Sequence, residues 1–348
     1  MLLEPITIAE FTRELVKLFA LAVGAFSLAM LLTPVYTYMA YRYRFWKKPR
    51  TTSTTGEELT VFSKLHEGKH RRNIPTMAGL IAVIVVSAVT LALNLDREQT
   101  WLPLAALIGG AAVGLIDDII NIRGDGTGVS GLRSSVKFLM ITAIAAVAAW
   151  FFYAKLGYTD VMVPFVGPVE LGWLIVPLFI LAVVSTGNAV NISDGLDGLA
   201  GGLLANAYGI FAVIALLQGN FGIAGFCFTV MGALFSYIWF NIHPARFFMG
   251  DVGSFALGTA LGVVAMLTDT IFLLPIIGFV FVMEAGSSLV QIASKRLFGR
   301  KIFLSAPVHH HLEAMGWPET KVTMRFWVIG QIVGFIGLLL ALAGGNIA

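Results

Sequence analysis

Polar side chains that could do chemistry gather in a few short stretches of an otherwise apolar chain. They are Asp117, Asp118, Asn188, Asn191, Asp194, Asp197, Asn241, His243, Arg246, Asp251, His309, His310 and His311. Carboxylate oxygens are the ligands that Mg²⁺ prefers, together with the phosphate oxygens of a substrate. Carboxylates also position or deprotonate an attacking oxygen. The inventory is therefore typical of metal-assisted phosphoryl transfer.

The stretch GLIDDIINI places Asp117 and Asp118 at the end of an apolar segment. Adjacent residues of a helix point about 100° apart, so the two carboxylates are not expected to serve one face equally. Charges this close to hydrocarbon are costly and are taken as functional by default. The alternative is that they cap or solvate a helix end.

The stretch NAVNISDGLDGLAGG repeats a polar residue every three positions, near one face of a helix or helix-like turn. Its polar residues are Asn188, Asn191, Asp194 and Asp197, and Gly195 and Gly198 interrupt it. Amides and carboxylates beside glycines, which permit close approach, suit a sugar or a nucleotide. Helix capping explains one or two of these residues but not all four.

Asp251 lies in WFNIHPARFFMGDVGS, in an expected short loop between two spans, and is flanked by Gly250 and Gly253. The glycines would let a metal ion approach its carboxylate without hindrance. A solvated loop aspartate is the alternative.

The consecutive His309, His310 and His311 follow a basic run that includes Arg300 and Lys301. Three adjacent histidines cannot all face one metal from a regular helix or strand, and zinc would require a further ligand at suitable spacing. Their basic neighbours favour anion binding, and an ordinary surface loop is the alternative. The basic stretch KHRRNIPTMAG is a further phosphate-binding candidate, with anionic lipid headgroups as its competing partner.

The elements that position these residues are expected to be membrane-spanning helices. The chain has 348 residues, of which 57% are hydrophobic and only 12% charged, whereas soluble domains carry about 25% charged residues. Its one cysteine, Cys227, excludes an intramolecular disulfide and a cysteine metal cluster. We predict one all-α polytopic membrane domain over residues 1–348, with no soluble domain. About ten transmembrane helices are predicted, at 17–40, 76–95, 102–122, 134–154, 173–192, 198–218, 222–241, 253–268, 270–292 and 324–344.

Basic residues orient these spans. All but four of them, Arg13, Lys17, Arg97 and Lys155, fall in the connections that follow odd-numbered spans, or in the adjoining helix ends. The positive-inside rule then places these connections in the cytoplasm and both termini outside. The outer connection 158–172 has short apolar runs around Gly-Pro and predicts a small hairpin. A transporter is the rival class, but its polar residues would lie near the bilayer midplane rather than at one interface.

Several stretches resemble one bacterial family, the phospho-N-acetylmuramoyl-pentapeptide transferases. They are GLIDD, NAVNISDGLDGLAGG, WFNIHPARFFMGDVGS, GRKIFLSAPVHHHLEAMGWPE, PTMAG and KVTMRFW, which together span nearly the whole chain. The aspartate stretches are shared by the wider superfamily of polyprenyl-phosphate sugar-1-phosphate transferases. APVHHH and PTMAG point to the muramoyl-pentapeptide branch.

The resemblance implies a ten-span, dimeric inner-membrane enzyme of peptidoglycan biosynthesis with a cytoplasmic active site. Its implied reaction transfers phospho-MurNAc-pentapeptide from UDP-MurNAc-pentapeptide to undecaprenyl phosphate with Mg²⁺, giving lipid I and UMP. Membrane lipids are expected partners and nucleic acid is not. The alternative donors are UDP-GlcNAc or another UDP-sugar.

The resemblance also implies roles for individual residues. Asp117, Asp118, Lys137 and Asp251 match catalytic positions, and Asp251 matches the magnesium ligand. Substrate-binding positions are matched by Arg71, Thr76, Asn188, Asn191, Asp194, Asp197, Asn241, Phe248, Gln291, His309, His310 and His311. The chain departs from the family before PTMAG, where Arg71, Arg72, Asn73 and Ile74 replace lysines and Gly-Thr. Direct attack by the lipid phosphate, with Asp117 as base, is the mechanism we expect.

Overall fold

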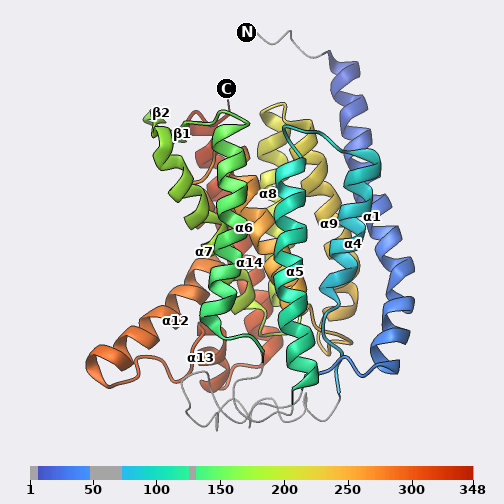
Figure 1. Ribbon diagram of the computed structural model, residues 1–348, viewed down its shortest axis with the longest axis vertical. Helices are drawn as coiled ribbons and strands as arrows, with labels where there is room; N and C mark the ends of the chain where they lie inside the picture. The colour runs from blue at the N-terminus through green and yellow to red at the C-terminus, as the bar shows by residue number, and fades with distance from the viewer. Residues whose placement is uncertain (1–6, 48–72, 125–130, 348) are drawn as a thin grey trace.

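The predicted all-α membrane architecture is confirmed. The computed structural model describes residues 7–47, 73–124 and 131–347, and most of its helices run side by side in one bundle (Figure 1). Within these ranges, eight helices are long and apolar enough to cross a membrane. They are α1 (Ile8–Arg42), α5 (Trp101–Arg123), α6 (Ser134–Ala154), α7 (Ile175–Ser193), α8 (Leu199–Leu217), α9 (Phe221–Asn241), α10 (Gly250–Leu267) and α14 (Glu319–Ala343).

The other two predicted spans differ from the expectation. The segment predicted at 76–95 forms α4 (Gly79–Leu93), an apolar helix of 15 residues, shorter than the roughly 20 residues that a perpendicular span requires. The segment predicted at 270–292 is not continuous, because Gly278 separates α11 (Leu274–Ile277) from α12 (Phe279–Phe298). The stretch with the three histidines forms a short helix, α13 (Val308–Ala314).

Helix α12 leans away from the bundle at the end opposite the two termini (Figure 1). It buries a polar stripe of Glu284, Ser287, Gln291 and Ser294. Its exposed side includes large apolar residues such as Leu289. This inverted pattern suits a helix whose outer side touches lipid while its polar side holds the segment between α12 and α13.

The predicted hairpin is confirmed as β1 (Asp160–Val163) and β2 (Gly167–Glu170), which pair antiparallel with Asp160 opposite Glu170. The backbone amide of Met162 donates to the Asp269 carboxylate at 2.8 Å. These contacts fix the hairpin at the end of the bundle where both termini lie (Figure 1).

Helix α10 forms the centre of the bundle, and every one of its residues except Asp251 is buried. Glycines allow its backbone to touch the neighbouring helices. A Cβ atom added at Gly114 of α5 would lie 2.1 Å from the Asp251 carbonyl oxygen, and one at Gly258 of α10 would lie 2.8 Å from the Gly187 Cα of α7. Small residues that permit such approach are the usual basis of close helix packing in membranes. The contact at Gly114 brings the end of α5 against the beginning of α10.

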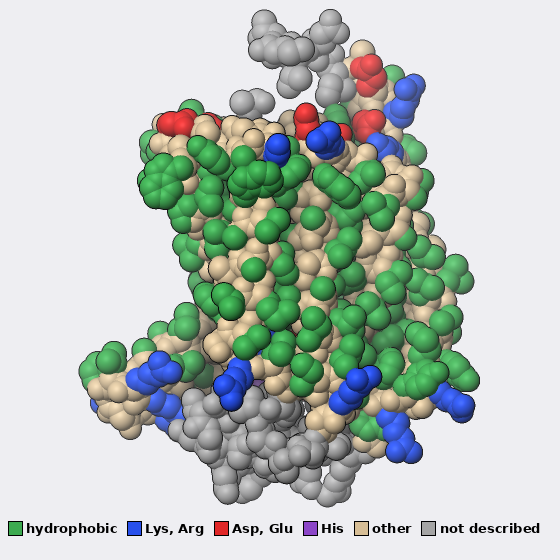
Figure 2. Space-filling view, viewed as in Figure 1, with side chains coloured by type: hydrophobic (Ala, Val, Ile, Leu, Met, Phe, Trp, Pro, Cys, Tyr) green, Lys and Arg blue, Asp and Glu red, His purple; other side chains and the backbone are tan. Residues whose placement is uncertain are grey.

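Side-chain chemistry is distributed as a membrane protein requires. On the face shown in Figure 2, hydrophobic side chains cover the middle of the molecule and charged side chains gather toward its two ends. The coloured charges near α12 are Lys and Arg, whereas both signs occur near the termini. The chain is therefore a multi-pass membrane protein with a basic end.

Candidate active site

The centre of the site is the Asp251 carboxylate, which lies between two lysines. Lys137 Nζ is 3.2 Å from Asp251 Oδ2 and 3.2 Å from Asp117 Oδ2. Lys47 Nζ is 3.2 Å from Asp251 Oδ1 and 2.8 Å from Asp118 Oδ1. Three carboxylates and two ammonium groups thus form one chain of ion pairs, built from α5, α6, α10 and the segment after α1. The catalytic residues that the sequence predicted are brought together here.

Asp117 and Asp118 are both buried, at 1% and 0% exposure, and each is held by separate donors. Asp117 accepts hydrogen bonds from the Leu132 amide at 2.6 Å and from Asn121 Nδ2 at 2.9 Å. Asp118 Oδ2 accepts one from the Val252 amide at 3.0 Å. As expected for adjacent residues of one helix, the two carboxylates serve different partners.

Asp251 lies in the first turn of α10 rather than in the predicted loop. Gly250, which begins that helix, has a φ of 77°, a conformation that side chains other than glycine's rarely tolerate. A Cβ atom at this position would lie 2.6 Å from Asp118 Oδ2. Gly250 therefore allows both the turn and the close approach of the Asp118 carboxylate.

Lys47 is positively charged in this setting. Burial lowers its pKa, but the carboxylates of Asp251 and Asp118 more than offset that effect and hold the pKa of Lys47 above its usual value. An ammonium bound to two carboxylates is the expected form of such a group.

In the polar run at the end of α7, the residues differ in whether they contact α10 and the three-carboxylate centre. Asn191 Nδ2 donates to Ser254 Oγ of α10 at 2.9 Å, whereas Asn188 Nδ2 donates to the carbonyl of Val184 in its own helix. Asp194 follows the last residue of α7, and burial raises its pKa to about 7, with Asp251 and Asp118 adding to the shift and Lys47 opposing it. Asp194 is thus electrostatically linked to the three-carboxylate centre.

Asp197 belongs to a second group, with His243 and Glu319, whose ligand atoms all lie within 4.8 Å of one another. His243 Nδ1 is 3.0 Å from Asp197 Oδ2, which also accepts from the Ala245 amide at 3.0 Å, and Glu319 Oε1 accepts from the Asp197 amide at 2.6 Å. These bonds tie the start of α14 to the connections before α8 and α10. The three side chains are close enough to hold a metal ion, but their hydrogen bonds to one another and to the backbone already account for their arrangement as a structural brace between these segments.

The predicted binding residues Asn241 and Phe248 also have structural partners. Asn241 uses both ends of its amide, accepting from the Gly198 amide at 2.9 Å and donating to the Phe247 carbonyl at 2.9 Å. Phe248, which is half-buried, pairs through its backbone with the segment that contains Thr76: its amide donates to the Pro75 carbonyl at 2.8 Å. Thr76 is buried at 3% exposure. Arg71 lies outside the described residues.

The three histidines have three different environments. His309 is fully buried, with Nδ1 at 2.7 Å from Glu284 Oε2 of α12. His310 is nearly buried and its Nδ1 lies 2.8 Å from Glu313 Oε2. His311 is half-buried and accepts from the Leu304 amide at 3.2 Å. The sequence-based expectation that the three would not converge on one point is confirmed.

His309 also joins this helix to the polar run after α7. A Cβ atom at Gly195 would lie 2.4 Å from His309 Nε2. Gln291 of α12 plays a similar part, because its side chain accepts from the amides of Ile302 and Phe303, both at 3.0 Å, and donates to the Phe303 carbonyl. Gln291 thus shapes the segment before α13.

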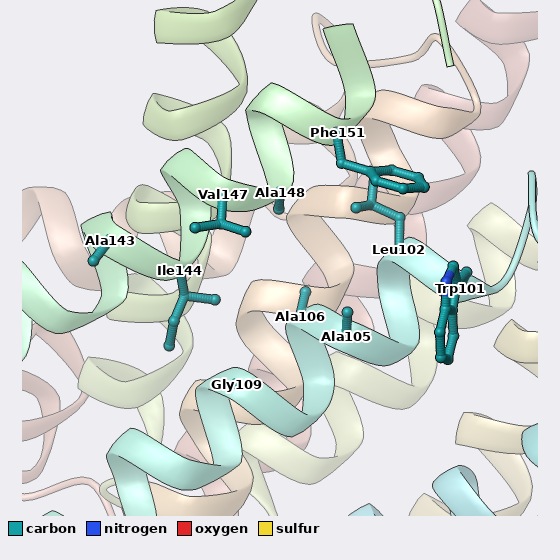
Figure 3. A pocket seen from close by; sticks show the side chains of 10 residues that line it. All are labelled: Trp101, Leu102, Ala105, Ala106, Gly109, Ala143, Ile144, Val147, Ala148 and Phe151. Atoms are coloured by element: carbon teal, nitrogen blue, oxygen red, sulfur yellow. The ribbon is translucent and has the colours of Figure 1, made fainter. Parts of the chain in front are cut away.

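A groove of about 500 Å³ lies away from this chemistry, between α5 and α6 (Figure 3). It is apolar, and on α5 it extends from Trp101 to Gly109, toward the helix end opposite Asp117. Nothing in its lining could act on a phosphate. The groove is a feature of the membrane-facing surface and is distinct from the candidate active site.

Comparison with known proteins places the chain in a family. A family model described as glycosyl transferase family 4 matches residues 100–269. The phospho-N-acetylmuramoyl-pentapeptide-transferase of Chloroflexus aggregans is 36% identical over 97% of this chain and 93% of its own length. The chain belongs to the phospho-N-acetylmuramoyl-pentapeptide-transferase family. Proteins of the same name from Desulfotalea psychrophila and Geobacillus kaustophilus are 37% and 36% identical, covering 91% and 92% of the chain. The chain is accordingly a transferase enzyme.

Two residues of this transferase that pair with the predicted site residues were not predicted from the sequence. Lys47 was one basic residue among many after the first span, and no local pattern indicated that it reaches Asp118 and Asp251. Glu284 had a weak signal, as a carboxylate within an apolar segment. Such a residue requires a partner, and the structure supplies His309.

Proposed function

We propose that the protein transfers phospho-MurNAc-pentapeptide from UDP-MurNAc-pentapeptide to undecaprenyl phosphate, giving lipid I and UMP. The observation that carries this proposal is the Asp251 carboxylate shared by two lysines, which link it to Asp117 and Asp118. The family relationship over 97% of the chain supports the same reaction. Carboxylates and lysines at one end of the bundle suit two anionic phosphates that meet at a membrane surface.

Asp118 and Asp251 would hold Mg²⁺ in this reaction. Their Oδ1 atoms, from two different helices, converge on one nitrogen at 2.8 and 3.2 Å, so they already share a cation position. Mg²⁺ commonly binds one or two carboxylates and completes its coordination with water and substrate phosphates. When bound, it would neutralise the donor diphosphate and stabilise the leaving UMP. The Asp197 group suits this role less well, because its oxygens brace the backbone.

The reaction makes one bond and breaks one. An oxygen of the lipid phosphate attacks the sugar-linked phosphorus of the donor, and the bond from that phosphorus to the oxygen of UMP breaks. A phosphate monoester has a second pKa of about 6, so at neutral pH the acceptor is mainly a dianion. It can therefore attack without first losing a proton to the enzyme.

Because the acceptor phosphate needs no base, Asp117 is assigned a positioning role rather than the predicted role of base. Its carboxylate already accepts from Leu132 and Asn121 and pairs with Lys137. Lys137 is thereby aimed at the centre, where its ammonium can stabilise charge on the transferred phosphate. If Asp117 only positions Lys137, Asp117→Asn lowers kcat while the acidic limb of the pH–rate profile is retained. Loss of the acidic limb in Asp117→Asn would instead indicate that Asp117 is the base.

Recognition of the donor is assigned to the groups around the centre. Asp194 and Asp197 lie in the connection from α7 to α8, which Asn241 contacts at Gly198, while α13 lies against Gly195 through His309. The nucleoside and the sugar-peptide would face these two regions respectively. His310→Ala should therefore raise the donor KM more than it changes the Mg²⁺ requirement.

We infer that the basic end of the bundle faces the cytoplasm of a bacterial inner membrane, which leaves both termini outside. The positive-inside rule supports this orientation, since Arg42, Lys295 and Arg296 occupy helix ends at the same end as the site. A homodimer is inferred from the family resemblance alone, and native mass spectrometry in detergent tests it.

A donor panel tests the function. Purified protein in detergent, with radiolabelled undecaprenyl phosphate and Mg²⁺, should form labelled lipid and UMP from UDP-MurNAc-pentapeptide. Asp251→Asn is the matched control and should abolish both products. Turnover only with UDP-GlcNAc would contradict the donor assignment. Substrate flux in liposomes without UMP formation would instead indicate a transporter.

The direct reaction is tested separately. An enzyme that forms an aspartyl-phosphate intermediate would release UMP without acceptor, in an amount equal to the enzyme present. A single-turnover experiment lacking undecaprenyl phosphate should show no such release. Stoichiometric UMP release would contradict direct attack.

A further inference from the structure

Lys47 occupies the position where two metal-binding oxygens converge. Asp118 Oδ2 is engaged by the Val252 amide, which leaves Oδ1 to face the centre, and Lys47 Nζ lies 2.8 Å from it. The same nitrogen lies 3.2 Å from Asp251 Oδ1. Both oxygens that we assign to Mg²⁺ therefore already bind an ammonium of this chain.

One position cannot hold an ammonium and a divalent cation together. Like charges a few ångströms apart repel strongly where water is scarce, and Asp118 is fully buried. We propose that Lys47 is a tethered cation that holds Asp118 and Asp251 together until a divalent cation displaces it, and that its released ammonium then binds a substrate phosphate. This inference rests on the proposed function.

Lys47 is better suited to leave than Lys137. The Lys137 side chain extends from helix α6 and is 20% exposed, whereas that of Lys47 is 32% exposed. Lys137 Nζ also lies 5.9 Å from the centroid of the Phe255 ring. Lys47 follows α1 in a non-helical segment, in which the Phe45 amide donates to the Ala40 carbonyl and the Trp46 amide donates to the Arg44 carbonyl. Its side chain can therefore change position without moving a helix.

The consequence differs from that of an ordinary phosphate-binding lysine. A residue that only binds substrate leaves metal affinity unchanged when it is removed. A residue that competes with the metal has the opposite signature, because its removal strengthens metal binding and weakens substrate binding. Lys47→Gln should therefore bind Mn²⁺ about tenfold more tightly or better, while its KM for the donor or the acceptor rises.

Manganese binding to the full-length protein in detergent, without substrate, tests this by electron paramagnetic resonance. Lys47→Arg retains the charge and should keep weak, wild-type Mn²⁺ binding, and Arg42→Gln removes an exposed charge at the end of α1 and should also leave it unchanged. Asp251→Asn should abolish binding. Equal or weaker Mn²⁺ binding by Lys47→Gln would overturn the inference. If wild type and Asp251→Asn behave alike, the metal site in the proposed function fails instead.

A second measurement uses the wild-type protein, in case Lys47→Gln does not fold. Displacement should expose the Lys47 amine, so saturating Mg²⁺ should increase its acylation by an amine reagent at least about threefold, as followed by peptide mass spectrometry. Lys155, which lies beyond the far end of α6, is the internal control and should be labelled equally with and without Mg²⁺. Unchanged or reduced labelling of Lys47 would contradict displacement.

Discussion

The contact between α5 and α10 at Gly114 yields a quantitative prediction for catalysis. In Gly114→Ala, the new Cβ atom would lie 2.1 Å from the Asp251 carbonyl oxygen, 2.3 Å from the Asp251 carbonyl carbon and 2.5 Å from the Val252 nitrogen. All three are backbone atoms, so no side-chain rotation can relieve the overlap. The two helices must separate at the point where they bring Asp117 and Asp118 to Asp251.

The distance by which the two helices must separate sets the expected loss of catalytic rate. Ordinary contact begins at 3.4 Å, so the distance from the new Cβ to the Asp251 oxygen must grow by about 1.3 Å from its starting value of 2.1 Å. A misplacement of about 1 Å can lower a catalytic rate about 100-fold. Overpacking of this kind also destabilises by about 1–3 kcal/mol. We therefore expect kcat to fall about 100-fold in a protein that remains folded.

The assay is UMP formation under saturating donor and acceptor, together with thermal unfolding and Mn²⁺ binding in the same detergent. Gly24→Ala in α1 is the matched control, because a Cβ atom there meets nothing within 4 Å, and its activity should equal that of wild type. Gly114→Ala should lose Mn²⁺ affinity as well as turnover, since its carboxylates are moved apart. Wild-type kcat and Mn²⁺ binding in Gly114→Ala would refute the idea that this helix contact sets the geometry of the centre.

Three further outcomes are expected. Burial raises the pKa of Asp194 from 3.8 to about 7, so the folded protein binds this proton more tightly than the unfolded chain, and stability falls as pH rises through that range. Between pH 4 and 8, Asp194→Asn should remove up to about 4 kcal/mol of this fall in the free energy of unfolding. The melting temperature of the variant should then depend less steeply on pH than that of wild type, and an unchanged slope would contradict the prediction. His309→Ala should lower the melting temperature more than His311→Ala, because His309 is fully buried against Glu284, and equal effects would argue against the brace. Removal of divalent cations with EDTA should stop UMP formation and added Mg²⁺ should restore it, whereas activity that persists in EDTA would exclude a metal requirement.

The sequence predicted the membrane architecture well because hydrocarbon imposes one simple rule. A span must be apolar over about 20 residues and must satisfy its own backbone hydrogen bonds, so the long runs of apolar residues predict helices almost directly. The rule fails where a run is interrupted: 270–292 contains Gly278, and the chain breaks there into α11 and α12. It also cannot show which helix is central, because burial of α10 depends on glycines such as Gly114 on another helix.

The candidate site was predicted in its residue types but not in its pairings. Asp117, Asp118 and Asp251 stand out because charges near hydrocarbon are rare. Their connection through Lys47 spans 71 and 204 positions of sequence, since Lys47 pairs with Asp118 and Asp251. Neither separation follows a helical or strand period, so no local pattern could reveal it. Gln291 and Asn241 were predicted to touch substrate, and no local pattern indicated that their side chains also support backbone segments that shape the site.

The three histidines show how residue type and position can suggest different roles. In sequence they form one motif, and anion binding by three adjacent imidazoles is a natural interpretation. In the structure His309 is fully buried against Glu284, and His311 accepts the Leu304 amide. His310 is paired with Glu313 from the same helix. Two of the three thus fix α13 and the segment before it, so the motif's influence on donor choice would act through the shape of this segment as well as through imidazole contacts. Substitutions of His309 and His311 that preserve those bonds should therefore change donor selectivity less than substitutions that disrupt the segment.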